Sequence, residues 1–109
     1  MAIPHAVPGQ AVAVQPLGSA LSTEKTSALF KATDLEVMRV VLMAGQVQPP
    51  HRVPGETTIQ CVEGTLTVTA DGTSHVLRAG HLLYLSGNVL HGMTALEDAS
   101  ALVTIALKR

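Results

Sequence analysis

The sequence predicts a single all-β domain, built as a sandwich or barrel of short strands. Its 109 residues can bury one core but are too few for two independent cores. Alternating apolar and polar residues recur in short runs, and no segment keeps a helical periodicity. Turn signals separate these runs at intervals of roughly 8 to 12 residues, which is typical of sandwiches and barrels.

Residues 1–25 are expected to form an N-terminal extended arm with one short strand, and residues 26–109 to form the β-barrel. Pro4 and Pro8 oppose helix formation at the start of the arm. The β-prone run at residues 11–14 could pair with a sheet edge of this chain or of a partner, or stay disordered. Residues 19–25 could form one helical turn or a loop.

The remaining strands follow from the alternating pattern and the turns between them. Asp71-Gly72 is the strongest hairpin signal, because both residues tolerate positive φ. Residues 46–50 contain two adjacent prolines that donate no hydrogen bonds, so we expect an extended loop that delivers His51 to the mouth of the barrel. The expected strands are residues 26–32, 35–43, 57–62, 65–70, 73–77, 81–85, 91–96 and 100–107.

Charge and composition exclude nucleic acid as a partner. Seven Lys and Arg nearly balance eight Asp and Glu, so no basic field gathers phosphates, and Phe30 and Tyr84 offer no platform for base stacking. Only 14% of the residues are charged while 47% are hydrophobic, so part of the apolar surface should face a second subunit. A homodimer is the expected assembly.

The single cysteine, Cys61, cannot form an intrachain disulfide. The N-terminal residues lack the features of a signal peptide, and no apolar run approaches the ~20 residues of a membrane span. We therefore expect a soluble, cytoplasmic protein that does not enter a membrane.

Two stretches combine glycines and histidines, each at its own spacing. Residues 45–64 read GQVQPPHRVPGETTIQCVEG, and residues 80–95 read GHLLYLSGNVLHGMTA. These stretches resemble the two motifs of the cupin superfamily, G-x5-H-x-H-x3or4-E-x6-G and G-x5-P-x-G-x2-H-x3-N. The resemblance covers about residues 35–107 and implies a jelly-roll cupin barrel, also called a double-stranded β-helix.

The resemblance also implies where a metal would bind. In metal-bearing cupins, two His and one Glu of the first motif and one His of the second hold one divalent transition metal, usually Zn, Fe, Ni or Mn. This chain keeps His51 and His91 and has Val53 and Thr57 at the other two positions. Glu56 is the nearest carboxylate; strand alternation turns it away from the side of Thr57, although the preceding glycine could let it swing inward.

Three interpretations of the histidine pair remain open. The pair could be an incomplete metal site that water, a ligand or Glu56 completes. It could instead be metal-free and bind or protonate an organic ligand, since imidazole changes charge near neutral pH. The third interpretation is a vestigial pair, hydrogen-bonded only to backbone or water.

Alternation along the strands predicts a ligand pocket around the two histidines. Cys61 should lie about 13 Å along the strand from Thr57, deep in the barrel, where a thiol is usually packing material. A mainly aliphatic lining favours a small, partly apolar ligand that carries one or two polar atoms. The predicted lining is His51, Val53, Thr57, Ile59, Cys61, Leu83, His91 and Met93, together with Val40 or Met38.

The leading functional hypothesis is a small cupin that binds a small organic molecule near His51 and His91, with no catalytic activity that the sequence assigns. The alternative is a metal-dependent cupin enzyme, dioxygenase- or isomerase-like, that adds an unorthodox third ligand such as Glu56. A third hypothesis is a structural or regulatory domain, for which a filled barrel would be the sign.

Overall fold

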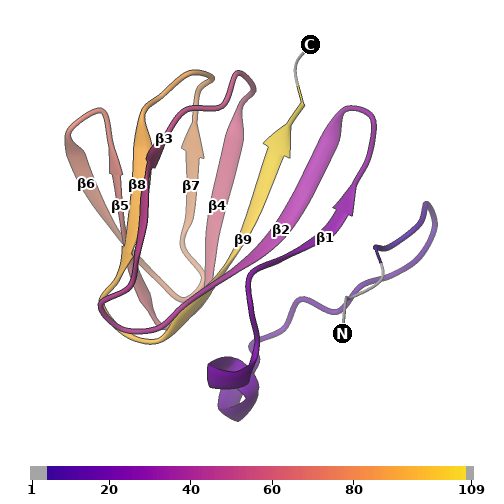
Figure 1. Cartoon of the computed structure of the whole chain (residues 1–109), viewed down its shortest axis with the longest axis horizontal. Coiled ribbons are helices and arrows are strands. Elements are labelled where there is room, and N and C mark those ends of the chain that lie inside the picture. The colour runs from indigo at the N-terminus through magenta and orange to yellow at the C-terminus, as the bar shows by residue number, and fades with distance from the viewer. Residues whose placement is uncertain (1–4, 108–109) are drawn as a thin grey trace.

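Two antiparallel sheets packed face to face make up the domain, as the computed structural model of residues 5–107 shows (Figure 1). One sheet has the strand order β1-β2-β9-β4-β7 and the other has the order β3-β8-β5-β6. The predicted all-β jelly-roll architecture is therefore confirmed. The strands are β1 (Ser27–Lys31), β2 (Leu35–Leu42), β3 (Val47–His51), β4 (Thr57–Glu63), β5 (Thr65–Ala70), β6 (Thr73–Arg78), β7 (Leu82–Leu85), β8 (His91–Ala95) and β9 (Ala99–Ala106).

Most predicted strands form within one or two residues of their expected bounds. The hairpin at Asp71-Gly72 joins β5 to β6 in continuous antiparallel register. A 3-10 helix, η1 (Gly18–Thr23), occupies most of the segment expected to be one helical turn or a loop. No helix among residues 5–107 is long and apolar enough to cross a membrane.

The strand expected at residues 11–14 does not form, so that part of the arm prediction is wrong. The guanidinium group of Arg39 donates to the backbone oxygens of Ala13 and Gln15, at 3.4 and 3.0 Å. A side chain of β2 therefore satisfies carbonyl groups that a neighbouring strand would otherwise pair. The arm crosses the outside of the β1-β2 side of the sheet instead of extending it (Figure 1).

The expected loop at residues 46–50 is also wrong, because Val47–His51 forms strand β3. This strand lies at the edge of its sheet and pairs only with β8. Its register shifts between Gln48 and His51, where Pro49 and Pro50 have no N–H to donate. Proline excludes a central strand but is tolerated at an edge or a bulge, and this segment is both.

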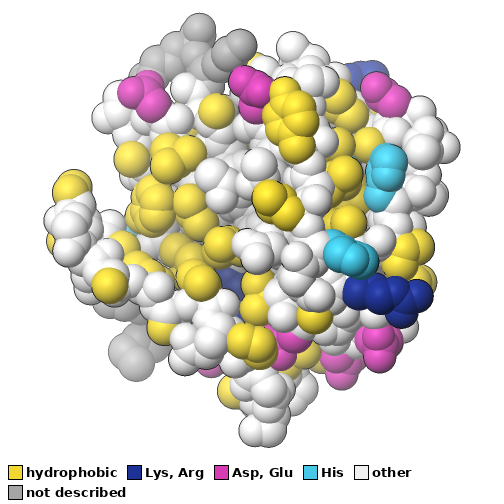
Figure 2. Space-filling model, turned by 180° about the vertical axis from the view of Figure 1, so that it is seen from behind, with side chains coloured by type: hydrophobic (Ala, Val, Ile, Leu, Met, Phe, Trp, Pro, Cys, Tyr) yellow, Lys and Arg dark blue, Asp and Glu magenta, His cyan; other side chains and the backbone are white. Residues whose placement is uncertain are grey.

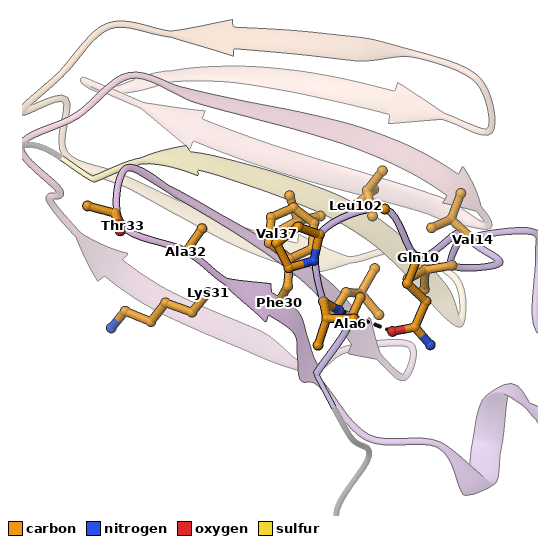
Figure 3. Close-up of a pocket in the computed structure, with 14 residues that line it drawn as sticks. Ala6, Gln10, Val14, Phe30, Lys31, Ala32, Thr33, Val37 and Leu102 are labelled. Atoms are coloured by element: carbon orange, nitrogen blue, oxygen red, sulfur yellow. Dashed lines mark hydrogen bonds between the residues drawn. The ribbon is translucent and has the colours of Figure 1, made fainter.

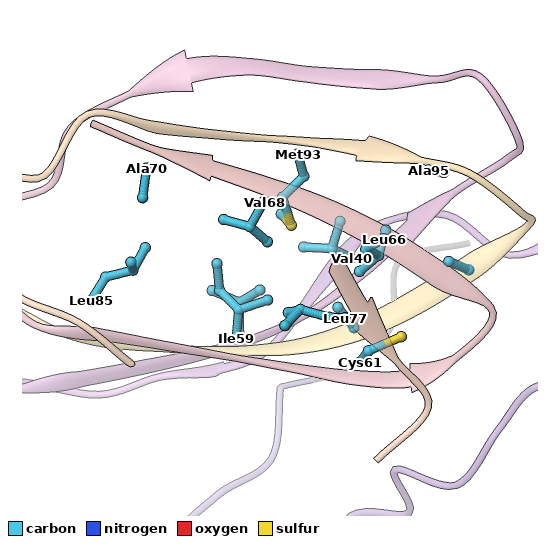
Figure 4. Close-up of a cluster of buried hydrophobic side chains, with 13 residues drawn as sticks. Val40, Ile59, Cys61, Leu66, Val68, Ala70, Leu77, Leu85, Met93 and Ala95 are labelled. Atoms are coloured by element: carbon cyan, nitrogen blue, oxygen red, sulfur yellow. The ribbon is translucent and has the colours of Figure 1, made fainter. Parts of the chain in front are cut away.

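The hydrophobic core fills the space between the sheets, where the inward side chains of both sheets meet (Figure 4). Ile59 and Cys61 point in from β4, and Leu66 and Val68 point in from β5 across from them. All four are essentially inaccessible to solvent. Side chains buried this completely are typically packed closely together. The histidines lie toward the other end of β4, near Thr57.

Candidate functional site

His51 and His91 lie opposite each other in the β3-β8 ladder, although 40 positions separate them in the sequence. Their ring centroids are 4.6 Å apart and the ring planes are inclined by 48°. One histidine ends β3 and the other begins β8, so both lie at the same mouth of the barrel. A single small molecule can therefore contact both rings.

Two glycines allow the chain to bring these ends together. A Cβ atom on Gly92 would lie 2.9 Å from the backbone oxygen of Gln48, so β3 approaches β8 this closely only because position 92 lacks a side chain. A Cβ atom on Gly87 would lie 2.2 Å from the backbone oxygen of Pro54. The backbone N–H of Asn88 also donates to Val53 O at 2.8 Å, so the loops beside the two histidines are held together.

Backbone carbonyls orient both imidazole rings. His91 Nδ1 lies 2.9 Å from Val89 O, and His51 Nδ1 makes a longer contact of 3.4 Å with Pro49 O. A carbonyl oxygen can only accept, so these contacts assign a proton to Nδ1 in both rings, and in the neutral form of each ring Nε2 then carries the free lone pair. His91 is buried, with 5% of its surface exposed, whereas His51 is exposed at the mouth.

A cavity of about 50 Å³ adjoins the histidine pair between the two sheets. Its volume admits one or two waters or the polar end of a small molecule, because one water occupies about 30 Å³ in the liquid. The barrel is therefore not completely filled at this end. A filled barrel was the sign expected of a purely structural domain. The lining consists of Met38, Val40, Gln48, His51, Val53, Thr57, Ile59, His91, Met93, Val103 and Ile105.

Two buried oxygens of this lining, Gln48 Oε1 and Thr57 Oγ1, have no hydrogen-bond partner within residues 5–107; we call them the oxygen pair. Thr57 has only 2% of its surface exposed. An unsatisfied buried polar group costs about 1–3 kcal/mol, so proteins rarely keep two in one place. The cavity therefore combines two imidazole lone pairs with an oxygen pair whose hydrogen bonds remain to be made.

The structure brings most of the predicted pocket residues around this cavity but places two elsewhere. Cys61 lies at the packed end of β4, where its thiol donates to the backbone oxygens of Glu63 and Gly64 at 3.5 Å, and burial raises its pKa. Leu83 packs against the core from β7. The predicted residues that line the cavity are His51, Val53, Thr57, Ile59, His91 and Met93, together with both Met38 and Val40, which were offered as alternatives.

Sequence reasoning missed three lining residues. Gln48 was not predicted to line the cavity because its segment was expected to be a loop. In the edge strand that forms instead, side chains alternate between the two faces, so Gln48 points inward and Val47 points outward. Val103 and Ile105 come from β9, and Ile105 pairs directly with Thr57. No local signal predicts which distant strand lies beside β4.

Glu56 does not join the histidines. Its carboxylate is exposed and accepts a hydrogen bond of 2.5 Å from the hydroxyl of Tyr84, a bond that raises the Tyr84 pKa. Tyr84 pairs with Thr58 on the outer face of the sheet, opposite to the side on which Thr57 faces the cavity. Glu56 therefore lies on the outside of the barrel, as alternation predicts for this position.

The donor set at the cavity can be compared with that of a catalytic metal site. Two neutral imidazoles and the neutral oxygen pair fall short of three histidines, or of two histidines and a carboxylate. In the part of the chain that the structure describes, no three His, Cys, Asp or Glu side chains gather in a metal-binding group. These residues alone do not supply the set of ligands that a catalytic transition metal normally has.

Comparisons with known proteins agree with this architecture. The family model described as "Cupin domain" matches residues 38–107. A conserved protein of unknown function from Streptococcus pyogenes is 18% identical, with a TM-score of 0.77 over 100% of this chain and 99% of its own. An RmlC-like cupin protein from Desulfovibrio desulfuricans is 23% identical, with a TM-score of 0.75 over 89% of this chain and 97% of its own.

An enzyme also shares the fold. Salicylate 1,2-dioxygenase from Pseudoaminobacter salicylatoxidans is 21% identical, with a TM-score of 0.64 over 66% of this chain and 21% of its own. No curated protein matches the sequence. At these identities the structural neighbours establish the fold, and the chemistry has to come from the residues of the cavity.

Proposed function

This chain belongs to the cupin domain family, and we propose that it binds a small neutral organic molecule whose polar head enters the cavity between His51 and His91. The observation that carries the proposal is the buried oxygen pair beside two imidazole lone pairs. A ligand that donates hydrogen bonds to these atoms would recover the free energy that their burial costs.

The lone pairs define the chemistry of the ligand head. Gln48 Oε1 and the two Nε2 atoms are acceptors, and Thr57 Oγ1 can accept or donate, so the head should carry at least two donors such as adjacent hydroxyls. No Lys or Arg lines the cavity among residues 5–107. A phosphate or carboxylate would therefore meet mainly acceptor atoms and no fixed positive charge.

Cavity size and lining define the rest of the ligand. About 50 Å³ admits the head only, compared with the roughly 300–1,000 Å³ of pockets that enclose whole drug-sized ligands. The body must therefore remain at the mouth, where His51 is exposed and Val53 is partly exposed. A compact apolar body carrying a vicinal diol meets these requirements.

A matched pair of probes tests the proposal. We expect cis-cyclohexane-1,2-diol to bind in the millimolar range and to shift the NMR signals of the Gln48 side-chain amide and of His91. Its dimethyl ether, which has the same body but no donors, should leave these signals in place. Binding of both probes with equal affinity, or of neither, would contradict the proposal.

Two neighbouring threonines supply the matched variants. Thr57→Val removes the cavity hydroxyl at nearly constant shape and should weaken diol binding about tenfold, the effect of losing one hydrogen bond. Thr58→Val makes the same change on the outer face and should leave binding unchanged. Equal effects of the two variants would place the diol outside the cavity.

A metal-dependent enzyme, dioxygenase- or isomerase-like, is the second candidate function. The observation that favours it is the contact of both Nδ1 atoms with backbone carbonyls, because metal-binding histidines are commonly oriented in this way. This candidate expects one Zn²⁺, Fe²⁺, Ni²⁺ or Mn²⁺ per chain after reconstitution. His51→Ala and His91→Ala should each abolish the bound metal in elemental analysis, and unchanged metal content in both variants would rule this candidate out.

A further inference from the structure

Two methionine side chains lie beside the histidines, and the proposed function gives them no role. Met38 from β2 and Met93 from β8 both belong to the lining of the histidine cavity. Met93 has 4% of its surface exposed and extends from β8 into the space between the sheets (Figure 4). The cavity therefore combines two imidazoles with two thioethers.

The strand register brings these four side chains together. His91 and Met93 are two residues apart on β8, so strand alternation turns both to the inside of the barrel. His51 lies opposite His91 in the β3-β8 ladder. Met38 pairs with Val103 of β9, which is another lining residue. The four donors therefore reach the cavity from both sheets.

Each of the four side chains can offer a lone pair to a metal ion. The contacts of both Nδ1 atoms with backbone carbonyls leave Nε2 as the acceptor of each neutral ring. A thioether sulfur is polarizable and uncharged, and it accepts hydrogen bonds only weakly. No Asp or Glu lines the cavity within residues 5–107. The donor set is therefore neutral and partly soft.

Such a set favours one kind of metal. Thioether ligands select Cu⁺, and imidazole binds copper as well as zinc. Zinc sites use thiolate, imidazole and carboxylate ligands, while Ca²⁺ and Mg²⁺ use oxygen ligands. A single positive charge also costs less to bury among neutral groups than two charges do. A bare metal ion is smaller than a water molecule, so a cavity of about 50 Å³ has room for it.

The other hollow of the molecule lacks these donors. It lies between the N-terminal arm and the outer face of β1, β2 and β9, and its volume is about 660 Å³. Figure 3 shows the side chains of Phe30, Val37 and Leu102 beneath the arm. Among the lining residues that the structure describes, none is His, Cys or Met. The smaller cavity is therefore the one whose chemistry suits a soft metal.

A histidine on the outer surface gives a second contrast. Figure 2 shows that histidine side chains also occur there. His81 is exposed directly before β7, and its Nδ1 accepts a hydrogen bond of 2.9 Å from the Arg78 N–H. In the neutral form of this ring Nε2 carries the proton, so neither nitrogen keeps a free lone pair. His81 is therefore a control for the two cavity histidines.

We propose that the cavity binds one soft monovalent metal ion, Cu⁺, through the side chains of His51, His91, Met38 and Met93. This site goes beyond the proposed function, because it names a second occupant of the same cavity and does not require that the diol binds. His91 and Met93 are buried and form the fixed part of the site. His51 is exposed and its Nδ1 contact is long, at 3.4 Å, so its ring can turn to complete the coordination.

NMR of the full chain labelled with ¹³C in its methionine methyl groups tests the site. An equimolar amount of Ag⁺, a redox-inert substitute for Cu⁺, should move the methyl signals of Met38 and Met93 and the ring signals of both cavity histidines. The methyl signal of Met43, which lines neither hollow, and the ring signals of His81 should stay in place. Cu⁺ under anaerobic conditions should reproduce these shifts, whereas Zn²⁺ should not.

Two methionines supply the matched variants. Met93→Leu removes the sulfur at nearly constant volume and should weaken Ag⁺ binding at least about tenfold. Met43→Leu makes the same change outside the cavity and should leave the affinity unchanged. The diol and its dimethyl ether report on the proposed function separately, so the metal site and the diol site can each fail alone.

Four results would overturn the metal site. These are Met38 and Met93 signals that do not respond to Ag⁺, equal effects of Met93→Leu and Met43→Leu, Zn²⁺ bound as tightly as Ag⁺, and Cu⁺ that leaves the signals in place. Silver held by the Cys61 thiol would give the first of these results, because Cys61 does not line the cavity.

Discussion

Strand β4 connects two regions that each contain a buried polar side chain but differ in how the polar atoms of that side chain are satisfied. Cys61, near one end, is fully buried, and its thiol contacts two backbone oxygens among densely packed apolar side chains. Thr57, at the other end, is almost as buried, yet its hydroxyl belongs to the oxygen pair beside a cavity. We call these regions the packed end and the open end.

The difference separates the part of the barrel that maintains the fold from the part that is available for binding. At the packed end, carbonyls, hydroxyls and even the carboxylate of Glu63 have partners. At the open end the protein tolerates a cost of about 1–3 kcal/mol for each unsatisfied oxygen. The burial of Cys61 and Thr57 alone would not reveal this difference, because both side chains are almost completely inaccessible to solvent.

The largest expected effect is a loss of stability on truncation at the packed end. Leu66 is 1% exposed, belongs to the hydrophobic core and does not itself line the histidine cavity. Leu66→Ala should lower the free energy of unfolding by about 2–5 kcal/mol, because the surrounding side chains cannot collapse fully into the space. Urea denaturation measures this change, and a loss below about 1 kcal/mol would mean that this end is not tightly packed.

Glu63 tests whether polar groups at the packed end are satisfied. Burial disfavours ionisation of this carboxyl, but hydrogen bonds from the Ser100 hydroxyl and from Leu17 and Gly18 N–H groups outweigh burial and lower its pKa. Glu63→Gln should therefore cost about 1–2 kcal/mol at pH 7. Because the folded-state pKa is below the ordinary value near 4.3, the stabilisation is complete above that value and is lost as pH falls through the folded-state pKa.

Urea denaturation of both proteins between pH 7 and pH 2 measures this dependence. The difference in stability should shrink at acidic pH, where Glu63 is protonated and resembles glutamine. Glu24→Gln, a change at an exposed position, is the control and should have no effect at either pH. A difference between natural protein and Glu63→Gln that does not depend on pH would contradict the assigned hydrogen bonds.

The two histidines should differ in their contribution to stability. His91 is buried and bonded to Val89 O, so His91→Ala should cost about 1–2 kcal/mol. His51 is exposed and its contact with Pro49 O is longer, so His51→Ala should change stability by less than about 0.5 kcal/mol. Equal losses in thermal unfolding would show that the rings are equally embedded and would weaken the distinction between mouth and interior.

The smallest expected effect of a substitution at the cavity is a gain in stability, not a loss. Thr57→Val replaces an unsatisfied hydroxyl by a methyl group of similar shape, so the ligand-free protein should gain about 1 kcal/mol. Thr58→Val, on the outer face of the same strand, should stay within about 0.5 kcal/mol of the natural protein. A loss of stability in Thr57→Val would mean that the hydroxyl already has a partner and that the open end resembles the packed end.

The sequence predicted the barrel well because strand alternation and turn residues are local signals. The hairpin at Asp71-Gly72 needed only two adjacent residues, and the alternation that separates Glu56 from Thr57 holds in the structure. Whether a strand lies at the edge of a sheet is not a local signal, because it depends on how all the strands of the sheet are ordered. The prolines of β3 suggested a loop, and Gln48 was missed with them.

The cavity itself was less accessible to prediction than the fold. The spacing of His51 and His91 pointed to a shared site, but the unsatisfied state of Gln48 Oε1 depends on every neighbouring side chain. Ile105 lies beside Thr57 through a pairing between residues nearly fifty positions apart, which no short pattern specifies. Whether a buried polar atom has a hydrogen-bond partner can be determined only from the three-dimensional structure.

The most direct test of the proposed binding site is a high-resolution crystal structure of the untagged protein soaked with cis-cyclohexane-1,2-diol. We predict that the diol lies between the imidazoles of His51 and His91, with its hydroxyls about 3 Å from Gln48 Oε1 and Thr57 Oγ1. A closed cavity in which both oxygens bond to protein groups, with the diol absent or bound elsewhere, would contradict the account.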